Sequence, residues 1–245
     1  MSLHLVEGRW APGISALDGA APGDEVLLFS SWARVEPWRG RYDAAVLQEL
    51  REGLAMAGER GLRRRVVLHA GAMPGWLRDR GGWEASDALA AWGCYVEALG
   101  AGLRGQVDGW VSLWEPSLDA LAHGPAWRRA GRVLLDAAAV AYLHLRRGSA
   151  ARADVDMLVA ERFGGEADTA REALAAILAD ATRERFVEVL RSGKLGLPWA
   201  VGGELPNGTP ALDGLLVLGA PSAATVGRWH ARGLAFRLVR DGTAR

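Results

Sequence analysis

The sequence Val-Ser-Leu-Trp-Glu-Pro at positions 111–116 is a short apolar run that ends abruptly in a carboxylate and a proline. Such a run is typical of a buried strand, and the proline ends it because proline has no N–H to donate to a sheet. Glu115 is therefore predicted to lie at the carboxyl end of a strand. In parallel α/β barrels that position holds catalytic side chains, although a glutamate there can also simply be solvated.

Short β-branched or leucine-rich runs alternate along the chain with longer runs of helical periodicity. The expected strands are residues 26–31, 66–69, 109–114, 155–159, 212–218 and 234–239, with 3–6 as a weaker seventh. Apolar spacing predicts helices capped by Asp43 and by Ser86, and further helices around 133–141 and 169–191. Strand-then-helix repetition implies parallel strands joined by right-handed crossovers.

The length of 245 residues suits one large domain, because barrels of this class commonly have about 250 residues. No repeat or linker divides the chain, so residues 1–245 are expected to form a single domain. A closed (β/α)8 barrel has eight strands, and fewer are recognised here. We therefore predict an α/β fold, a reduced TIM-barrel-like domain with fewer or irregular strands. Missing strands would leave an open edge that a second copy or a partner chain covers.

Composition excludes several classes of function. Half of the residues are hydrophobic, 24% are charged and the formal net charge is zero, so no global field favours nucleic acid or an anionic membrane. The basic run Arg63–Arg65 is expected to be a solvated loop. Cys94 is the single cysteine, and the histidines lack metal-ligand spacing. With no secretion signal and no membrane span recognised, we expect a cytoplasmic protein without metal or cofactor.

Four segments occur in an order that resembles glycoside hydrolase family 1. In that family an Arg-Gly-Gly-Trp turn leads through a helix to a strand that ends in Asn-Glu-Pro, and two earlier strands carry their own motifs. The matching segments here are Phe29–Arg34 with Pro37, His69 with Pro74 and Trp76–Leu77, Arg80–Trp83, and the strand that ends at Glu115 and Pro116. The resemblance covers roughly residues 25–147 and is faint beyond them.

The resemblance implies a β-glycoside hydrolase of carbohydrate metabolism in which Glu115 is the acid/base. It implies that Arg34 keeps a nucleophilic carboxylate ionised and that His69 hydrogen-bonds a sugar hydroxyl. Trp76 would cover an apolar sugar face, or else belong to the core. The further residues expected at the substrate are Trp114, at the strand end, and His123, on the loop that follows.

The chain also departs from the family pattern. Trp114 stands where the family has asparagine, and Ala-Gly-Ala-Met-Pro at 70–74 replaces Trp-Asp-Leu-Pro. A retaining glycosidase needs two carboxylates about 5–5.5 Å apart, but no Thr-Glu-Asn-Gly nucleophile motif is present. Gly203–Gly208 is the nearest match, with two residues inserted. It makes Glu204 the candidate nucleophile, or else a loop glutamate beside a turn.

Two hypotheses of different class follow from this mixture. The first is a barrel that binds a sugar or sugar-like ligand and has weak or altered β-glycosidase activity. The second is a catalytically dead barrel, a pseudoenzyme that acts as a binding or assembly module. The retained Arg34, His69 and Glu115 favour the first hypothesis, and the missing nucleophile favours the second.

Overall fold

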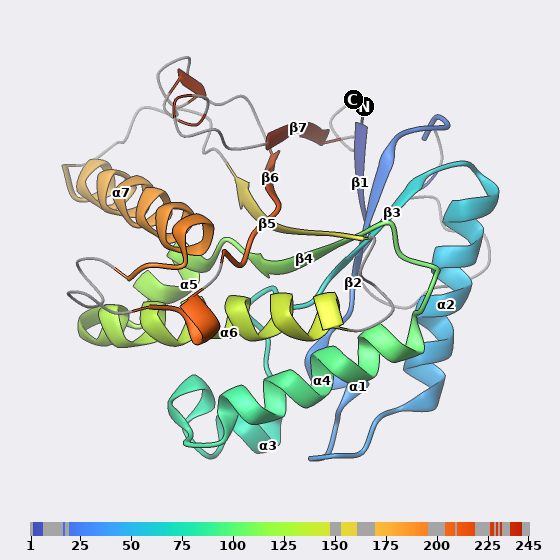
Figure 1. Ribbon diagram of the computed structural model, residues 1–245, viewed down its shortest axis with the longest axis horizontal. Coiled ribbons are helices and arrows are strands. Elements are labelled where there is room, and N and C mark those ends of the chain that lie inside the picture. Colours follow the sequence, from blue (N-terminus) through green and yellow to red (C-terminus); the bar gives the residue numbers. More distant parts are fainter. Residues whose placement is uncertain are drawn as a thin grey trace.

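In the part of the chain that the structure describes, seven parallel strands close into a barrel in the computed structural model of this protein (Figure 1). Each strand pairs with the next in the chain, and the first pairs with the last through Ser2–Arg240 and Leu3–Asp241. The strands are β1 (Ser2–Val6), β2 (Glu25–Phe29), β3 (Arg63–Val67), β4 (Gly109–Trp114), β5 (Asp154–Ala160), β6 (Gly214–Leu218) and β7 (Phe236–Asp241). The structure describes residues 2–6, 17, 20–147, 153–160, 170–195, 204–208, 210–218, 226–227, 229, 231 and 236–241.

Helices surround the barrel on its outside, with α2 and α7 on opposite sides in Figure 1. They are α1 (Trp32–Val35), α2 (Ala44–Glu59), α3 (Gly75–Arg78), α4 (Ala88–Gly102), α5 (Pro116–Ala122), α6 (Trp127–Arg147) and α7 (Ala170–Ser192). The short 3-10 helices are η2 (Gly82–Glu84), η3 (Gly124–Ala126) and η4 (Pro206–Gly208). Within the described ranges, none of these helices has the length and apolar character that a membrane span requires.

The predicted order of strands and helices is confirmed, with shifts at the ends. Asp43 caps α2 as expected, because its carboxylate accepts from the N–H groups of Ala45 and Val46. The N-cap of α4 is Asp87, not Ser86, and Asp87 pairs with arginines instead of capping. The reduced barrel is also confirmed. The prediction of an open edge is wrong, because β1 and β7 pair. Association with a second copy or a partner chain stays a prediction, but an open edge no longer supports it.

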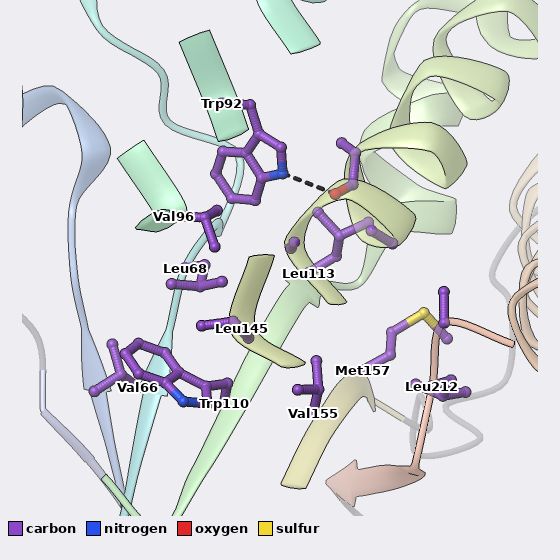
Figure 2. Close-up of a cluster of buried hydrophobic side chains, with 14 of the residues drawn as sticks. Val66, Leu68, Trp92, Val96, Trp110, Leu113, Leu145, Val155, Met157 and Leu212 are labelled. Atoms are coloured by element: carbon purple, nitrogen blue, oxygen red, sulfur yellow. Dashed lines mark hydrogen bonds between the residues drawn. The ribbon is translucent and has the colours of Figure 1, made fainter. Parts of the chain in front are cut away.

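The outer faces of the strands pack against the helices and form the larger part of the core. Figure 2 shows this layer, which includes Val66, Leu68, Trp110, Leu113, Val155 and Met157. Trp92 of α4 donates its indole N–H to the carbonyl of Ala137 on α6 at 2.8 Å (Figure 2). A Cβ at Gly93 would lie 2.9 Å from Nε2 of His144, so a glycine at that position lets α4 and α6 approach closely.

The inner faces divide the barrel into a charged and an apolar half. Arg65 is fully buried near the amino ends of the strands, with Nε 3.1 Å from Glu25 and Nη1 2.5 Å from Asp156. Asp154 and Arg63 complete the cluster nearer to solvent. The prediction that Arg63–Arg65 form a solvated loop is therefore wrong. Alternation along β3 puts Arg63 and Arg65 on the inner face, and Arg65 is buried there, where a charge requires partners.

The apolar half of the interior lies towards the carboxyl ends of the strands. Its side chains are Leu27, Val67, Val111 and Leu216, with Phe29 and Trp114 packed on them. A bulge in β4 creates this arrangement: Val111 pairs with Asp156 and Trp114 pairs with Leu158, so β4 uses one residue more than β5. The extra residue turns Trp114 into the barrel, where its ring lies 5.2 Å from that of Phe29.

Burial raises the pKa of Asp156 from 3.8 to about 6, while the Arg65 guanidinium opposes the rise and the neighbouring carboxylates Asp154, Asp213 and Glu25 add to it. The charge count explains why a proton is favoured here. Three carboxylates of the cluster, Glu25, Asp154 and Asp156, face two guanidinium groups. One added proton makes this buried group of charges neutral.

The first prediction concerns the space that Gly109 leaves for Arg65. A Cβ at Gly109 would lie 2.3 Å from Nη1 of Arg65, so Gly109→Ala should lower the free energy of unfolding by about 1–3 kcal/mol. The matched control is Gly100→Ala on α4, where the new Cβ meets Leu145 at an ordinary 3.5 Å. That change should be neutral or stabilising by up to about 1 kcal/mol in urea unfolding. Equal effects of the two changes would contradict the packing described here.

The second prediction concerns the pH dependence of stability. Because the folded pKa of Asp156 lies above its ordinary value, protonation stabilises the folded state below pH 6, and this contribution is lost as the pH rises through 6. Urea unfolding at pH 5 and pH 7.5 should give wild type about 1 kcal/mol more acid stabilisation than Asp156→Asn. An identical difference between the two pH values in both proteins would contradict the assignment to Asp156.

Candidate functional site

Glu115 occupies the predicted position at the carboxyl end of β4, directly before Pro116 begins α5. Its backbone is left-handed, with φ 42° and ψ 54°. It is the one non-glycine residue with positive φ in the described part of the chain, and it is 5% exposed. The left-handed conformation is disfavoured for residues with a Cβ, and such strain gathers at functional sites. The backbone geometry therefore singles out the residue that the sequence placed at the rim.

A cavity of about 310 Å³ opens beside the carboxyl ends of β2 and β3. Its lining is formed by Phe29, Ser30, Ser31, Trp32, Arg34, Val67, Leu68, Ala70 and Ala72. Arg34 lies on α1, and its Nη2 donates to the carboxylate of Glu49 on α2 at 2.7 Å. This predicted site residue thus reaches the cavity while it is also bonded to a helix outside the barrel.

His69, a predicted site residue, and Trp32 lie shortly after the ends of β3 and β2, and both belong to an aromatic cluster that includes Trp92 and Tyr95 of α4. The ring of His69 stands edge-on to Trp83 at 5.3 Å and to Trp92 at 6.1 Å. Trp32 packs against Trp92 and Tyr95. His69 is 3% exposed, and of these two residues only Trp32 is among the described residues that line the cavity.

The remaining predicted substrate contacts lie apart from one another. Trp76 on α3 is half-buried and donates its indole N–H to the carbonyl of Glu36 at 3.1 Å. His123 is exposed at the end of α5, and Trp114 faces the barrel interior. Trp76 thus has a structural contact as the core interpretation expected, whereas the roles of His123 and Trp114 at a substrate stay predictions.

Glu204 lies outside the strands, between α7 and β6. It is exposed, forms a bridge with Lys194 just after α7, and belongs to the connection that leads into β6. Hydrogen bonds hold this connection against the end of α7, from Leu205 N–H to Gly193 at 2.8 Å and from Ala211 N–H to Leu190 at 2.7 Å. Because connections into parallel strands enter at their amino ends, we expect Glu204 to lie apart from Glu115, and its role as a nucleophile stays a prediction. The resemblance of residues 203–208 to a nucleophile motif does not indicate at which end of the barrel Glu204 lies.

The sequence analysis missed Glu36, a buried carboxylate that fixes the loop after β2. Its oxygens accept from the indole N–H of Trp32 at 2.8 Å and from the N–H of Gly40 at 2.7 Å. The spacing of four residues between Trp32 and Glu36 could have indicated this contact, because such residues share a helical face. In the described residues, no group of three or more His, Cys, Asp or Glu side chains could hold a metal ion.

The chain matches no protein-family model and no curated protein. Solved structures do match it: the β-glycosidase from Pyrococcus horikoshii has a TM-score of 0.63 at 22% identity and aligns with 81% of this chain. The β-glucosidase from Exiguobacterium marinum has a TM-score of 0.64 at 18% identity over 79% of the chain. The β-glucosidase from Thermotoga maritima in complex with glucoimidazole has a TM-score of 0.63 at 18% identity over 80%.

The fold is a reduced (β/α) barrel similar to that of glycoside hydrolase family 1 β-glucosidases of known structure. The chain spans about half the length of the matching structures, which are covered to 49%, 50% and 51% of their own chains. This likeness confirms the sequence-based resemblance at the level of fold. Activity has to be inferred from the site.

The third prediction tests the strain at Glu115. Glycine adopts left-handed backbone without the penalty that a Cβ brings, so Glu115→Gly should be more stable than Glu115→Ala by about 1 kcal/mol in urea unfolding. Both variants lose the carboxylate, and the comparison therefore isolates the backbone. A more stable alanine variant would contradict a left-handed Glu115 in the folded protein.

Proposed function

We propose that this protein, acting as one barrel domain, binds a sugar or sugar-like ligand at the carboxyl ends of its strands and has weak or altered β-glycosidase activity. The observation that carries the proposal is the buried, left-handed Glu115 at the end of β4. Functional side chains of (β/α) barrels come from strand ends of this kind. In the matching fold, β-glucosidases from Thermotoga maritima were solved with glucoimidazole and with deoxynojirimycin, which supports a sugar-like ligand.

Glu115 can supply proton transfer to or from a glycosidic oxygen. A buried carboxyl group at a rigid strand end suits that role, because general acid–base catalysis depends on a positioned donor. Retaining hydrolysis also needs a second carboxylate about 5–5.5 Å away. Glu204 belongs to the connection into β6, Glu36 accepts hydrogen bonds within the loop after β2, and Glu49 on α2 pairs with Arg34. These contacts favour slow turnover.

The alternative is a catalytically dead barrel that serves as a binding or assembly module. The position of Glu204 in the connection into β6 favours it, as does Trp114, which packs on Phe29 where the family pattern has an amide. Both hypotheses place the ligand at the same end of the barrel. They differ in whether the protein hydrolyses the ligand with Glu115 as the proton donor.

The fourth prediction compares two glutamate variants that differ only in position. Glu115→Gln should lower hydrolysis of a 4-nitrophenyl β-glycoside by about 10²–10⁴-fold, the usual contribution of general acid–base catalysis. Glu204→Gln, in the connection into β6, is the matched control and should leave the rate unchanged. Initial rates from a panel of β-glucosides, β-galactosides and β-mannosides measure the effect.

The possible outcomes separate the two functions. Wild type that binds glucoimidazole in calorimetry yet releases no nitrophenol above buffer would support the binding module. Equal loss in Glu115→Gln and Glu204→Gln would contradict the placement of Glu204. Absence of both binding and turnover for every sugar tested would refute the proposed function.

A further inference from the structure

One tryptophan lies on the surface in the connection between α1 and α2. Trp38 is 68% exposed, and it is the one large hydrophobic side chain among the described residues that is exposed to this degree. Pro37 beside it is exposed as well. An indole ring has a large apolar area to bury, and tryptophan is enriched among the residues that contribute most to protein interfaces. Trp38 therefore adds little to the core and is placed to contact a partner.

The turn that carries Trp38 is held in one conformation by hydrogen bonds. The N–H of Arg41 donates to the carbonyl of Trp38 at 2.8 Å, and the buried carboxylate of Glu36 accepts from the N–H of Gly40 at 2.7 Å. Trp76 of α3 donates to the carbonyl of Glu36 at 3.1 Å and fixes the base of the turn. Gly40 has a φ of 70°, which closes the turn. A turn that is already ordered loses little conformational entropy when a partner binds.

The exposed charges beside Trp38 are mainly positive. Trp38 and Arg41 are bridge partners, so their side chains leave the turn on the same face. Within the described part of the chain, Arg41 has no ion-pair partner. Arg39 and Arg80 share the single carboxylate of Asp87, at 2.5 Å and 3.1 Å. Three exposed guanidinium groups thus face one carboxylate at this surface.

This charge decides between the possible occupants of the surface. In a symmetric dimer the same patch would contact itself, and the arginines of the two copies would repel one another. A neutral sugar chain can stack on the indole of Trp38 but leaves the arginines without a counter-charge. An acidic segment with an apolar side chain satisfies both features, because guanidinium groups bind carboxylates through paired hydrogen bonds. The buried Glu36 does not supply that counter-charge, since its oxygens accept hydrogen bonds from Trp32 and Gly40.

We propose that this turn binds an acidic segment of a partner protein, with an apolar side chain of the partner against Trp38 and its carboxylates at Arg39 and Arg41. Burial of the indole supplies most of the binding free energy, and the charges select the partner. This surface is separate from the proposed sugar site, because none of these three residues is among the described residues that line the cavity. Binding of the partner and binding of a sugar are therefore independent.

The fifth prediction uses two labelled synthetic peptides in fluorescence polarisation, Glu-Asp-Phe-Glu-Asp-Leu-Glu-Asp and its amide counterpart Gln-Asn-Phe-Gln-Asn-Leu-Gln-Asn. Wild type should bind the acidic peptide at least about tenfold more tightly than the amide peptide, because only the acidic peptide pairs with the arginines. Trp38→Ala and Arg41→Glu should each weaken binding of the acidic peptide at least about tenfold. Arg104→Glu makes the same charge change at an exposed position in the connection into β4, and this matched control should alter the affinity by less than about twofold at physiological salt.

Several outcomes would overturn this inference. They are no binding of the acidic peptide, equal affinity of wild type for the two peptides, full binding by Trp38→Ala, and equal weakening in Arg41→Glu and Arg104→Glu. Self-association in light scattering that Trp38→Ala abolishes, without peptide binding, would assign the turn to a second copy. Binding of a cello-oligosaccharide that Trp38→Ala abolishes, without peptide binding, would assign it to a carbohydrate.

The sugar site is measured in parallel, so that the two proposals fail separately. Glucoimidazole binding that is the same in wild type, Trp38→Ala and Arg41→Glu supports a separate surface, and its loss in both variants would contradict that separation. Circular dichroism of the variants verifies that each is folded, which the exposure of both side chains favours.

Discussion

Arg65 is fully buried inside the barrel, and the arrangement of four strands depends on how its charge is accommodated. Its guanidinium contacts Glu25 of β2 and Asp156 of β5, while Gly109 of β4 leaves the space for it. An unpaired charge in this position would cost several kcal/mol, so β2, β3 and β5 are held in the register that keeps these partners together. The amino half of the interior therefore holds the charged side chains of Arg65, Glu25 and Asp156. The carboxyl half is filled by apolar side chains, so a site at that end of the barrel has an apolar surface beside it.

The bulge in β4 links this packing to the candidate site. Without the extra residue, strict alternation would turn Trp114 to the helix side and leave the barrel mouth to another side chain. With it, Trp114 packs on Phe29, and Glu115 follows in left-handed backbone before Pro116 starts α5. The strained glutamate is thus a consequence of fitting a tryptophan into the interior directly before a helix. The same feature makes Trp114 part of the apolar half of the interior.

Local patterns predicted the parts of the structure that local physics determines. Short apolar runs located the strands that the structure describes, although β3 begins three residues before its predicted range, and the apolar run before Pro116 placed Glu115 at a strand end. Arg65 was not predictable in this way, because a basic run appears solvated until long-range partners such as Asp156 are known. The sequence could not place Glu204 either, because its motif resembles a nucleophile segment while hydrogen bonds hold its connection against the end of α7. The closure of β1 on β7 likewise depends on residues at the two ends of the chain.

Glu115 directly follows Trp114 of the apolar half of the interior, and this setting restricts the chemistry of the site. Glu115 can exchange a proton with a bound ligand, but the described carboxylates near β2 are committed to Trp32 and Arg34. Affinity in such a site comes mainly from apolar burial, which is non-directional and tolerates changes in the sugar. Catalysis instead requires interactions that strengthen in the transition state, and these come from charged groups aimed at the reacting atoms. The distribution of charge, concentrated around Arg65 at the far end of the barrel, therefore favours recognition over turnover.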